Sequence, residues 1–390
     1  MTTKAVSLQI PFHRAELGDE EIRAVTDVIR SGWLTMGTKT FEFERQFAAY
    51  VGASYAVAVN SCTAALHLAL EAVGVSHGDE VLVPTTTFTA TAEVITYFGA
   101  RPVLVDVDAT TLNLHVGDAE RKVTPRTRAI IPVHFAGTPC EMDEILRFAS
   151  HRNMHVIEDA AHALPSTYKG KRVGTIGELT AFSFYATKTL TTGEGGMVTT
   201  ENEKYAKRLQ VMRLHGIARD AWKRYTSEGS WFYEVQEAGY KYNLTDLQAA
   251  LGLVQLAKCD EMTLARERVA KSYNEAFQTF ESLETPSAPR DRTTSWHLYV
   301  LRLNLDRLRI DRDRFIQELS ARGVGTSVHF IPLHLHPLYQ RQYGYQSGDF
   351  PIAEREYQRS LSLPIYPGMR SEEIEQVVSA VTEVASLWAR

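Results

Sequence analysis

The sequence predicts an α/β protein with a large domain, in which a mostly parallel sheet lies between helices, and a smaller α+β domain at the carboxyl end. Three observations predict this class. The chain has 390 residues, which is too many for a single hydrophobic core. Short apolar strands alternate with helical stretches in the first half, as in parallel sheets covered on both faces. Beyond Pro286 separate strands and helices follow a long helical stretch, so we expect domains of residues 1–257 and 258–390.

Helical periodicity marks the amino-terminal segment. Apolar residues at Ile22, Val25 and Val28 form a stripe on one helical face, and Gly32 ends that stretch. A polar loop that contains Trp33 separates it from a second amphipathic helix, EFERQFAAYVG. Strands and helices then alternate. The expected strands are AVAVN, EVLV, RPVLV, RAIIPV, HVIED and TAFSFY, and the expected helices among them are TAALHLALEAVG, TATAEVITYFG and DEILRFASHR.

The second half of the chain begins with a helical pattern over residues 203–216. Residues 220–243 are polar, aromatic and irregular, which is typical of a functional loop. Thr245 is a capping residue at the start of a long helical stretch that suits a connector between domains. The smaller domain then contains the expected strands WHLYVLRL and GTSVHFI and the expected helices RDRFIQELSARG and SEEIEQVVSAVTEVASLW.

Composition narrows the function classes. The chain is 44% apolar and 23% charged, an ordinary globular mixture, and its net charge of −5 argues against a nucleic-acid-binding surface. No stretch approaches the roughly 18 apolar residues of a membrane span, so we expect no membrane partner. The three cysteines, Cys62, Cys140 and Cys259, are far apart, which fits a reducing cytoplasm and offers no disulfide framework.

An acid and a lysine follow two predicted buried strands. Asp159 ends HVIED, and Lys188 follows TAFSFY and precedes the glycines of GEGG. An enzyme that uses pyridoxal phosphate needs an amine for a Schiff base and a carboxylate that keeps the pyridine nitrogen protonated. The alternatives are a helix N-cap for Asp159 and an ordinary solvated lysine. Lys188 differs from Lys169, Lys171 and Lys204 because it follows a buried strand.

A strand-to-helix junction at Ser61, Cys62 and Thr63 can bind phosphate. Free backbone N–H groups and the helix dipole attract anions there, and the Thr63 hydroxyl adds a donor. A plain Ser/Thr N-cap is the alternative. The chain contains neither G-x-x-x-x-G-K-[ST] nor G-x-G-x-x-G after a strand, so a Walker or Rossmann nucleotide site is not supported.

Other candidates are an aromatic residue and several histidines. Phe88 can stack on a cofactor ring or pack in the core, and His162 can contact the cofactor or pack on a helix. His329 belongs to a group with His334 and His336, which includes an H-x-H pair. No carboxylate or cysteine accompanies that group, so an imidazole that faces an anionic substrate is favoured over a metal site, and we expect no metal.

Longer strings resemble the DegT/StrS family of sugar-nucleotide aminotransferases from about Ile10 to the carboxyl terminus. EDAAHA, K-x-x-T-T-G-E-G-G and Y-N-x-x-D-L-Q-A-A are specific in combination, and SGWLTMG fits the entry loop of the family. The resemblance implies a pyridoxal 5'-phosphate enzyme of fold type I, acting as a homodimer with shared active sites. The family has His at the lysine position in sugar dehydratases, and Lys188 argues against that branch.

The resemblance also implies a role for each matching residue. Lys188 would form the Schiff base and act as the catalytic base, and Asp159 would pair with the pyridine nitrogen. The cofactor phosphate would be held by Thr63, the Cys62 backbone and Ser183, with Asn243 reaching across the dimer. The remaining expected contacts are Phe88 and His162 with the cofactor, and Trp33, Thr35, Tyr185 and His329 with the substrate.

The implied reaction is a ping-pong transamination. L-Glutamate would donate the amino group and leave as 2-oxoglutarate, and a keto sugar linked to UDP or dTDP would accept it. LHGIARDAWKR, GYKYNLTDLQ and SWHLYVLRL resemble members that make UDP-4-amino-4-deoxy-L-arabinose, which favours 4-amination. Amination of a 3-keto sugar is the nearest alternative. A silent sensor that binds the cofactor without turnover is a further one.

Overall fold

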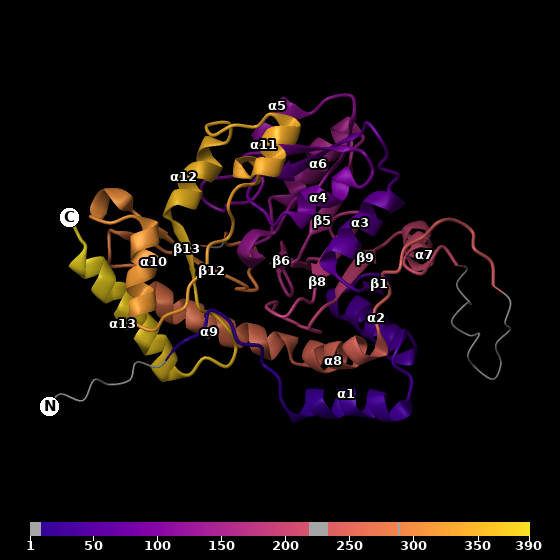
Figure 1. The fold of residues 1–390 in the computed structure, drawn as a ribbon, viewed down its shortest axis with the longest axis horizontal. Helices are drawn as coiled ribbons and strands as arrows, with labels where there is room; N and C mark the ends of the chain where they lie inside the picture. The colour runs from indigo at the N-terminus through magenta and orange to yellow at the C-terminus, as the bar shows by residue number, and fades with distance from the viewer. Residues whose placement is uncertain (1–8, 218–232, 288) are drawn as a thin grey trace.

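A computed structural model describes residues 9–217, 233–287 and 289–390 of the chain. Figure 1 shows a large part that surrounds a central sheet and a smaller part that carries the carboxyl terminus. Helices α8 (Asp246–Ala257) and α9 (Cys259–Phe277) run beneath both parts and connect them. The predicted α/β class, with a large part and a smaller α+β part, is confirmed.

The central sheet has seven strands in the order β1-β9-β8-β5-β4-β2-β3. Six strands run in one direction, and β9 is antiparallel to both of its neighbours, β1 and β8. Their side chains are almost all buried, which explains why their sequences are short continuous apolar runs. The strands are β1 (Tyr55–Val59), β2 (Glu80–Pro84), β3 (Arg101–Val105), β4 (Thr127–Ile130), β5 (His155–Asp159), β8 (Leu179–Ser183) and β9 (Gly196–Thr200).

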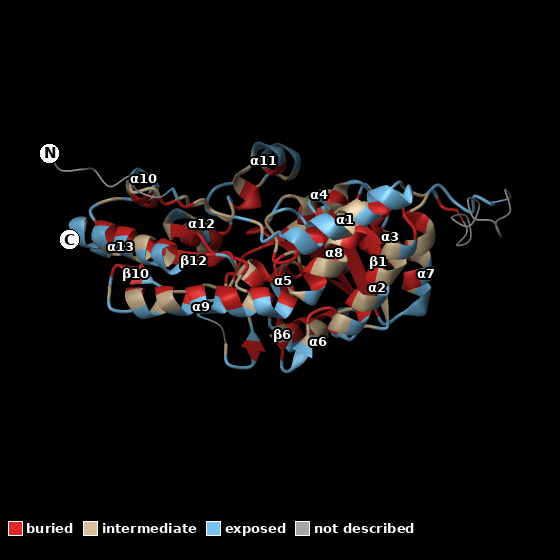
Figure 2. Ribbon diagram, turned by 90° about the horizontal axis from the view of Figure 1, so that it is seen from below, coloured by how far each residue is buried: buried red, intermediate tan, exposed pale blue. Residues whose placement is uncertain are grey.

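Helices cover both faces of this sheet. In Figure 2 the strands lie inside as buried residues, and the helices turn their exposed residues outward. Amphipathic patterns produce this arrangement because one apolar stripe of each helix packs on the sheet. The covering helices are α2 (Thr38–Val51), α3 (Cys62–Ala72), α4 (Ala90–Thr96), α5 (Val116–Lys122), α6 (Met142–Arg152), α7 (Glu203–Met212) and α8. Helix α1 (Asp19–Ser31) packs on α8, and its Ile22 and Ile29 are exposed, so the predicted apolar stripe is only partly buried.

The smaller part has its own core and an antiparallel sheet in the order β10-β12-β13. Aromatic side chains of α9, β12 and α10, among them Tyr273, Tyr299 and Phe315, are completely buried in that core. Its elements are β10 (Leu283–Glu284), β12 (Tyr299–Leu303), α10 (Arg312–Ala321), β13 (Ser360–Leu363) and α13 (Ser371–Leu387). Helices α11 (Pro337–Tyr343) and α12 (Pro351–Arg359) follow α10 in the chain, but Tyr339 and Ala353 pack in the core of the large part.

Short elements complete the described chain. A small antiparallel sheet, in the order β11-β6-β7, ties the connection after α9 to the large part. Its strands are β6 (Thr167–Tyr168), β7 (Lys171–Arg172) and β11 (Arg292–Thr293), and 3₁₀ turns lie at Phe135–Gly137, Leu305–Arg307 and Leu333–Leu335. Within the described ranges, no helix combines the length and hydropathy needed to cross a bilayer.

Two expected elements differ in the structure. The long stretch after Thr245 is two helices, because the N–H of Lys258 donates to the carbonyl of Gln255 at 3.2 Å, a three-residue spacing that breaks the α-helical path. GTSVHFI is not a strand in the described chain: it pairs through one bridge, between Ser327 and Ser362. The predicted boundary at residues 257 and 258 lies at the end of α8, and the division into domains stays a prediction.

Candidate active site

Strand register brings the candidate residues to one edge of the central sheet. Asp159, the last residue of β5, lies opposite Ala181 of β8, and Ser183 ends β8 opposite Gly196 of β9. Gly196 in turn lies opposite Val59, the last residue of β1, and the Ser61 junction follows directly. The carboxyl ends of parallel strands meet at one edge, where open α/β sheets place their ligands.

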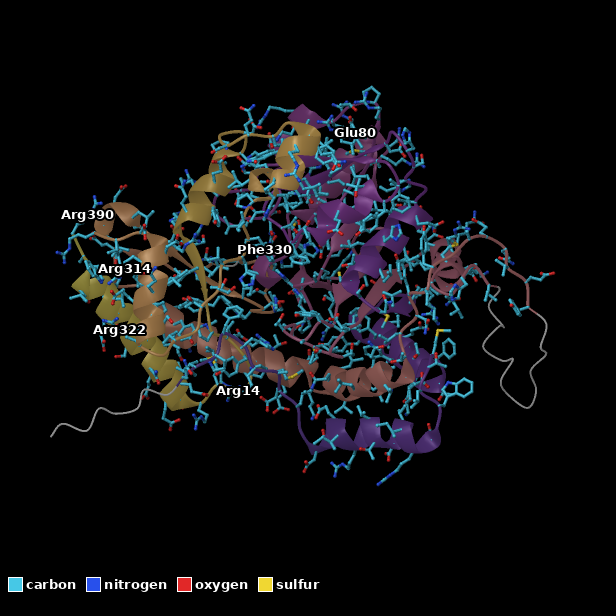
Figure 3. The ribbon with its side chains drawn as sticks, in the orientation of Figure 1. Arg14, Glu80, Arg314, Arg322, Phe330 and Arg390 are labelled. Atoms are coloured by element: carbon cyan, nitrogen blue, oxygen red, sulfur yellow. The ribbon has the colours of Figure 1, made fainter. Side chains whose placement is uncertain are left out.

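A cavity of about 470 Å3 opens at this edge. Most of its wall comes from the large part, and His297, His329 and Phe330 of the smaller part close it. Figure 3 shows Phe330 near the middle of the molecule, between the two parts. Nine of the predicted site residues line the cavity: Cys62, Thr63, Phe88, Asp159, His162, Ser183, Tyr185, Lys188 and His329.

Asp159 is a buried carboxylate with two fixed contacts. One oxygen accepts a hydrogen bond from the Thr91 hydroxyl at 2.7 Å, and the other accepts one from the Ala161 N–H at 3.0 Å. Thr87 lies 2.8 Å from Thr91, oxygen to oxygen, and extends the chain of hydroxyls. Burial raises the pKa of the Asp159 carboxyl, and the Thr91 bond opposes that rise. Sequence reasoning missed Thr91 because it lies 68 residues away along the chain.

The neighbouring carboxylate, Glu158, points to the opposite face of the strand and is completely buried. One of its oxygens accepts bonds from the Gly177 N–H at 2.7 Å and the Thr180 hydroxyl at 2.8 Å. The other lies 2.8 Å from Nε2 of His134, whose Nδ1 accepts a bond from the Cys140 N–H. The backbone that carries Asp159 is therefore tied to the segments on both sides.

Lys188 lies in the connection between β8 and β9 and lines the same cavity as Asp159. Part of its side chain is open to the cavity, and protein surrounds the remainder. This burial lowers the pKa of Lys188 to about 8, and the negative charge of Asp159 opposes the shift. A large fraction of the lysine is therefore the neutral amine near pH 8, the form that acts as a nucleophile or a base.

The amino end of α3 faces the same cavity. The Ser61 side chain caps this helix by accepting a bond from the Ala64 N–H at 3.1 Å, so the N-cap alternative is correct for Ser61. The first N–H groups of the helix, at Cys62 and Thr63, lie at its open end, where anions bind. A Cβ on Gly196 would lie 2.5 Å from the Ser61 carbonyl oxygen, so only glycine lets β9 approach this junction.

Histidine and aromatic rings form the wall next to Asp159. Nδ1 of His162 accepts a bond from the Ala136 N–H at 3.3 Å, which leaves the proton on Nε2. The rings of His162 and His297 lie 4.4 Å apart, and Phe330 stacks on His162 at 5.9 Å. Burial lowers the pKa of His162, and the charge of Lys188 adds to the effect. His297 was not singled out from the sequence, because nothing local distinguishes WHLYV from a core strand.

Two aromatic side chains at the cavity are unusually exposed. Phe88 is 59% exposed and Tyr185 is 48% exposed, although large aromatic residues normally bury most of their surface. Core packing is therefore excluded for Phe88. Both rings are available to a ligand.

Three predicted residues lie outside this cavity. Trp33 lines a separate surface pocket with Gly37 and Asp246, and Thr35 is exposed in the same loop. The side-chain oxygen of Asn243 accepts a bond from Lys241 at 2.6 Å, and its backbone forms a bridge with Val59 at the end of β1. Most of the predicted functional loop at residues 220–243 lies outside the described residues.

These groups fit pyridoxal 5'-phosphate. The cavity offers a desolvated amine at Lys188, a buried carboxylate at Asp159 and a helix amino end with hydroxyls beside it. These are the three functions that the aldehyde, the pyridine nitrogen and the phosphate of the cofactor require. The arrangement suits chemistry at an amine, with the neutral lysine as the proton carrier.

Comparisons with known proteins agree with this chemistry. The model of the DegT/DnrJ/EryC1/StrS aminotransferase family matches residues 15–382. The chain is 54% identical to the uncharacterized protein MJ1066 of Methanocaldococcus jannaschii over 377 residues, 97% of this chain and 98% of that protein. It is 50% identical to the spore coat polysaccharide biosynthesis protein SpsC of Bacillus subtilis, over 96% and 97% of the two chains.

Solved structures share the fold at lower sequence identity. The putative sugar aminotransferase Spr1654 of Streptococcus pneumoniae superimposes with a TM-score of 0.91 at 34% identity. The match covers 97% of this chain and 98% of the PMP-form or 99% of the PLP-form.

Proposed function

Since the chain belongs to the DegT/DnrJ/EryC1/StrS aminotransferase family and is a pyridoxal phosphate-dependent sugar aminotransferase, we propose that it converts a nucleotide-linked 4-keto sugar into a 4-amino-4-deoxy sugar. L-Glutamate is the proposed amino donor, and UDP or dTDP is the proposed carrier. The observation that supports catalysis is the pairing in one cavity of a lysine whose pKa is lowered to about 8 with a buried carboxylate.

Each residue has a proposed task. When bound, pyridoxal phosphate supplies an electron sink for the carbanion that forms at the reacting carbon. Asp159 keeps the ring nitrogen protonated, and the α3 amino end with Ser183 binds the phosphate. Lys188 would hold the cofactor through its amine and, as a neutral base, would carry a proton at the reacting carbon. The N–H on Nε2 of His162 is available to a polar group of the cofactor ring.

The exposed aromatic rings support a large, flat ligand beside the cofactor. Phe88 is the proposed stacking partner of the pyridine ring, and Tyr185 and His329 are proposed contacts of the sugar. The resemblance of LHGIARDAWKR and GYKYNLTDLQ to 4-aminating members supports position 4 over position 3. We propose a cytoplasmic location, because the three cysteines are far apart and free, as is usual in a reducing compartment.

A homodimer completes the proposed site. Asn243, Trp33 and Thr35 lie outside the cavity of their own chain. In a two-fold dimer such residues can reach the cavity of the partner subunit, which is the role that the family resemblance implies for Asn243. Light scattering should give twice the mass of one chain. Asn243→Ala should weaken cofactor binding without changing that mass.

The substrate is tested directly by product analysis. The holoenzyme is mixed with L-glutamate and, separately, with nucleotide-linked 4-keto and 3-keto sugars on UDP and dTDP. Mass spectrometry should detect the exchange of a carbonyl oxygen for an amine on a 4-keto sugar. Amination of the 3-keto sugar alone would overturn the proposed position and retain the aminotransferase.

Lys188→Ala tests the catalytic assignment. The variant should bind pyridoxal phosphate only noncovalently, so that borohydride no longer fixes the cofactor to the protein, and it should form no product. Lys171→Ala, at an exposed lysine that begins β7, is the control and should behave as the wild type. Measurable turnover by Lys188→Ala would remove Lys188 from the mechanism.

A further inference from the structure

A buried arginine lies close to the cavity without a carboxylate partner. Arg266 of α9 is 1% exposed, and its Nη1 donates to the carbonyl oxygen of Ile365 at 2.7 Å. Its Nε is buried and has no hydrogen-bond partner. Across residues 9–217, 233–287 and 289–390, no Asp or Glu forms an ion pair with it. Buried charges are normally paired, so the surroundings of Arg266 lack an anion.

A small recess adjoins the main cavity, and Arg266 lies behind its wall, bound to the carbonyl oxygen of Ile365. Its wall includes His13, Thr187 and His297, and also Ile365, whose carbonyl binds Arg266. Thr187 and His297 line the main cavity as well, so the two spaces share a wall next to Lys188. The recess has a volume of about 20 Å3, which holds one water-sized group. A single carboxylate oxygen has that size, and a phosphate group is too large.

The groups around the recess favour an anion. Nδ1 of His297 is buried and has no partner, so this imidazole has an unused polar atom. Burial lowers the pKa of His13 to about 4, and the charge of Arg266 adds to the effect. Burial lowers the pKa of His297 as well, and among the further causes are the positive charges of Lys188 and Arg266. Both imidazoles are therefore neutral and lie in a positive potential. The Nε2 of His13 already donates to the carbonyl of Ala186 at 3.1 Å, so His297 is the imidazole with an unused nitrogen for a ligand.

We propose that this recess binds the α-carboxylate of the amino donor, with the charge of Arg266 and the imidazole of His297 as its partners. The inference rests on the proposed function, because it requires an α-amino acid as the donor. A donor whose carboxylate occupies the recess has its amino group on the side of Lys188, because Thr187 directly precedes that lysine. A keto sugar has no carboxylate and leaves the recess empty.

Donor binding without turnover tests the proposal. 2-Methylglutamate lacks the α-hydrogen, so it can bind to the holoenzyme but cannot be converted. In calorimetric titration, Arg266→Met should weaken its binding about 10-fold, the effect expected when a buried positive charge that acts on the carboxylate through space is lost. Arg266→Lys should lose less because it keeps the charge. His297→Phe should lose several-fold because it keeps the ring contacts but has no N–H.

A matched control distinguishes a role of Arg266 in donor binding from a role in stability alone. Arg312 is another buried arginine, whose Nη1 donates to the carbonyls of Tyr357 and Ser360 in the smaller part. Arg312→Met should lower the melting temperature and leave the affinity for 2-methylglutamate unchanged. The binding of the keto sugar to the amine-loaded enzyme should be the same in Arg266→Met and the wild type. Cofactor content and thermal unfolding are measured for every variant.

One outcome overturns the inference alone, and another overturns it together with the function. If Arg266→Met and His297→Phe both bind 2-methylglutamate like the wild type, the recess does not hold the carboxylate, and the proposed function stands. If the wild type does not react with glutamate, the proposed donor is wrong, and the comparison is repeated with the 2-methyl analogue of whichever α-amino acid reacts. If the enzyme reacts with amines that lack a carboxylate and with no α-amino acid, both the inference and the proposed function are overturned.

Discussion

The hydroxyl of Thr91, in the first turn of α4, donates a hydrogen bond of 2.7 Å to the carboxylate of Asp159 at the end of β5. Thr91 is 1% exposed, so water cannot replace it. This bond stabilises the ionised form of a carboxyl whose pKa burial raises. It therefore connects the helix after β2 with the charge that the cofactor ring requires.

Thr91→Val should raise the pKa of Asp159 further, because valine keeps the shape and removes the donor. The affinity of the apoprotein for pyridoxal phosphate should then fall at a pH about one unit higher than in the wild type, as expected for the loss of a hydrogen bond to a charged group. Thr91→Ser should restore the wild-type profile. Thr96→Val on the same helix is the control, since its hydroxyl binds the carbonyl of Glu93. An unchanged profile in Thr91→Val would contradict the prediction.

Attachment of the cofactor should depend on pH through Lys188. The neutral amine attacks the aldehyde, so the rate of attachment to the apoprotein should rise with pH and reach half its maximum near pH 8. Stopped-flow absorbance between pH 6 and pH 10 measures it. The unfolded chain keeps the proton on this lysine up to about pH 10, so Lys188 makes the folded apoprotein more stable as the pH rises through this window. A midpoint near 10 would show an ordinary solvated lysine.

Gly137→Ala should destabilise the protein strongly. Gly137 has a φ of +102°, and a Cβ there would lie 2.1 Å from the hydroxyl oxygen of Ser295. We expect a loss of about 2–4 kcal/mol in the free energy of unfolding, from backbone strain and the clash together. Gly170 is the control, because its φ is +80° and its Cβ would meet nothing within 4 Å. Gly170→Ala should cost about 1 kcal/mol. Equal losses in urea unfolding would contradict the role of the clash.

Asp246→Ala should loosen the segment that carries Trp33. The buried carboxylate of Asp246 accepts bonds from the N–H groups of Gly37 and Thr40 at 2.8 and 2.9 Å, and one from the Thr40 hydroxyl at 2.8 Å. It thereby caps α2 from a distant part of the chain. Its loss should lower the free energy of unfolding by about 2–4 kcal/mol, because several donors become unsatisfied. Asp27→Ala, at an exposed ion pair, should change it by less than about 0.5 kcal/mol. If chemical unfolding gives the two variants equal stability, Asp246 does not stabilise the protein by capping α2.

The local part of the site was predictable from the sequence. Asp159 ends one buried strand and Lys188 follows another, and the order of the strands brings such ends together. Partners from distant segments were not predictable. Thr91 contacts Asp159, and Arg266 binds the carbonyl of Ile365 near the recess, and neither contact leaves a local pattern.

The errors in the fold have similar physical causes. Helical periodicity continues on both sides of Lys258, so it could not reveal that the helix breaks there. GTSVHFI alternates like a strand, but it forms a single bridge, to Ser362 in the edge strand β13. Strand pairing depends on the partner segment, which the local sequence does not contain.

Glu158 keeps the end of β5 ordered in the apoprotein, before the cofactor binds. Its bonds to Gly177, Thr180 and His134 involve only the protein, so they hold the end of β5 in place whether or not the pyridine ring is present. Pyridoxal phosphate therefore docks on a rigid, preorganised edge, and little of its binding free energy is consumed in ordering this part of the chain. Loss and regain of the cofactor should then be reversible exchange at a folded surface, without a refolding step.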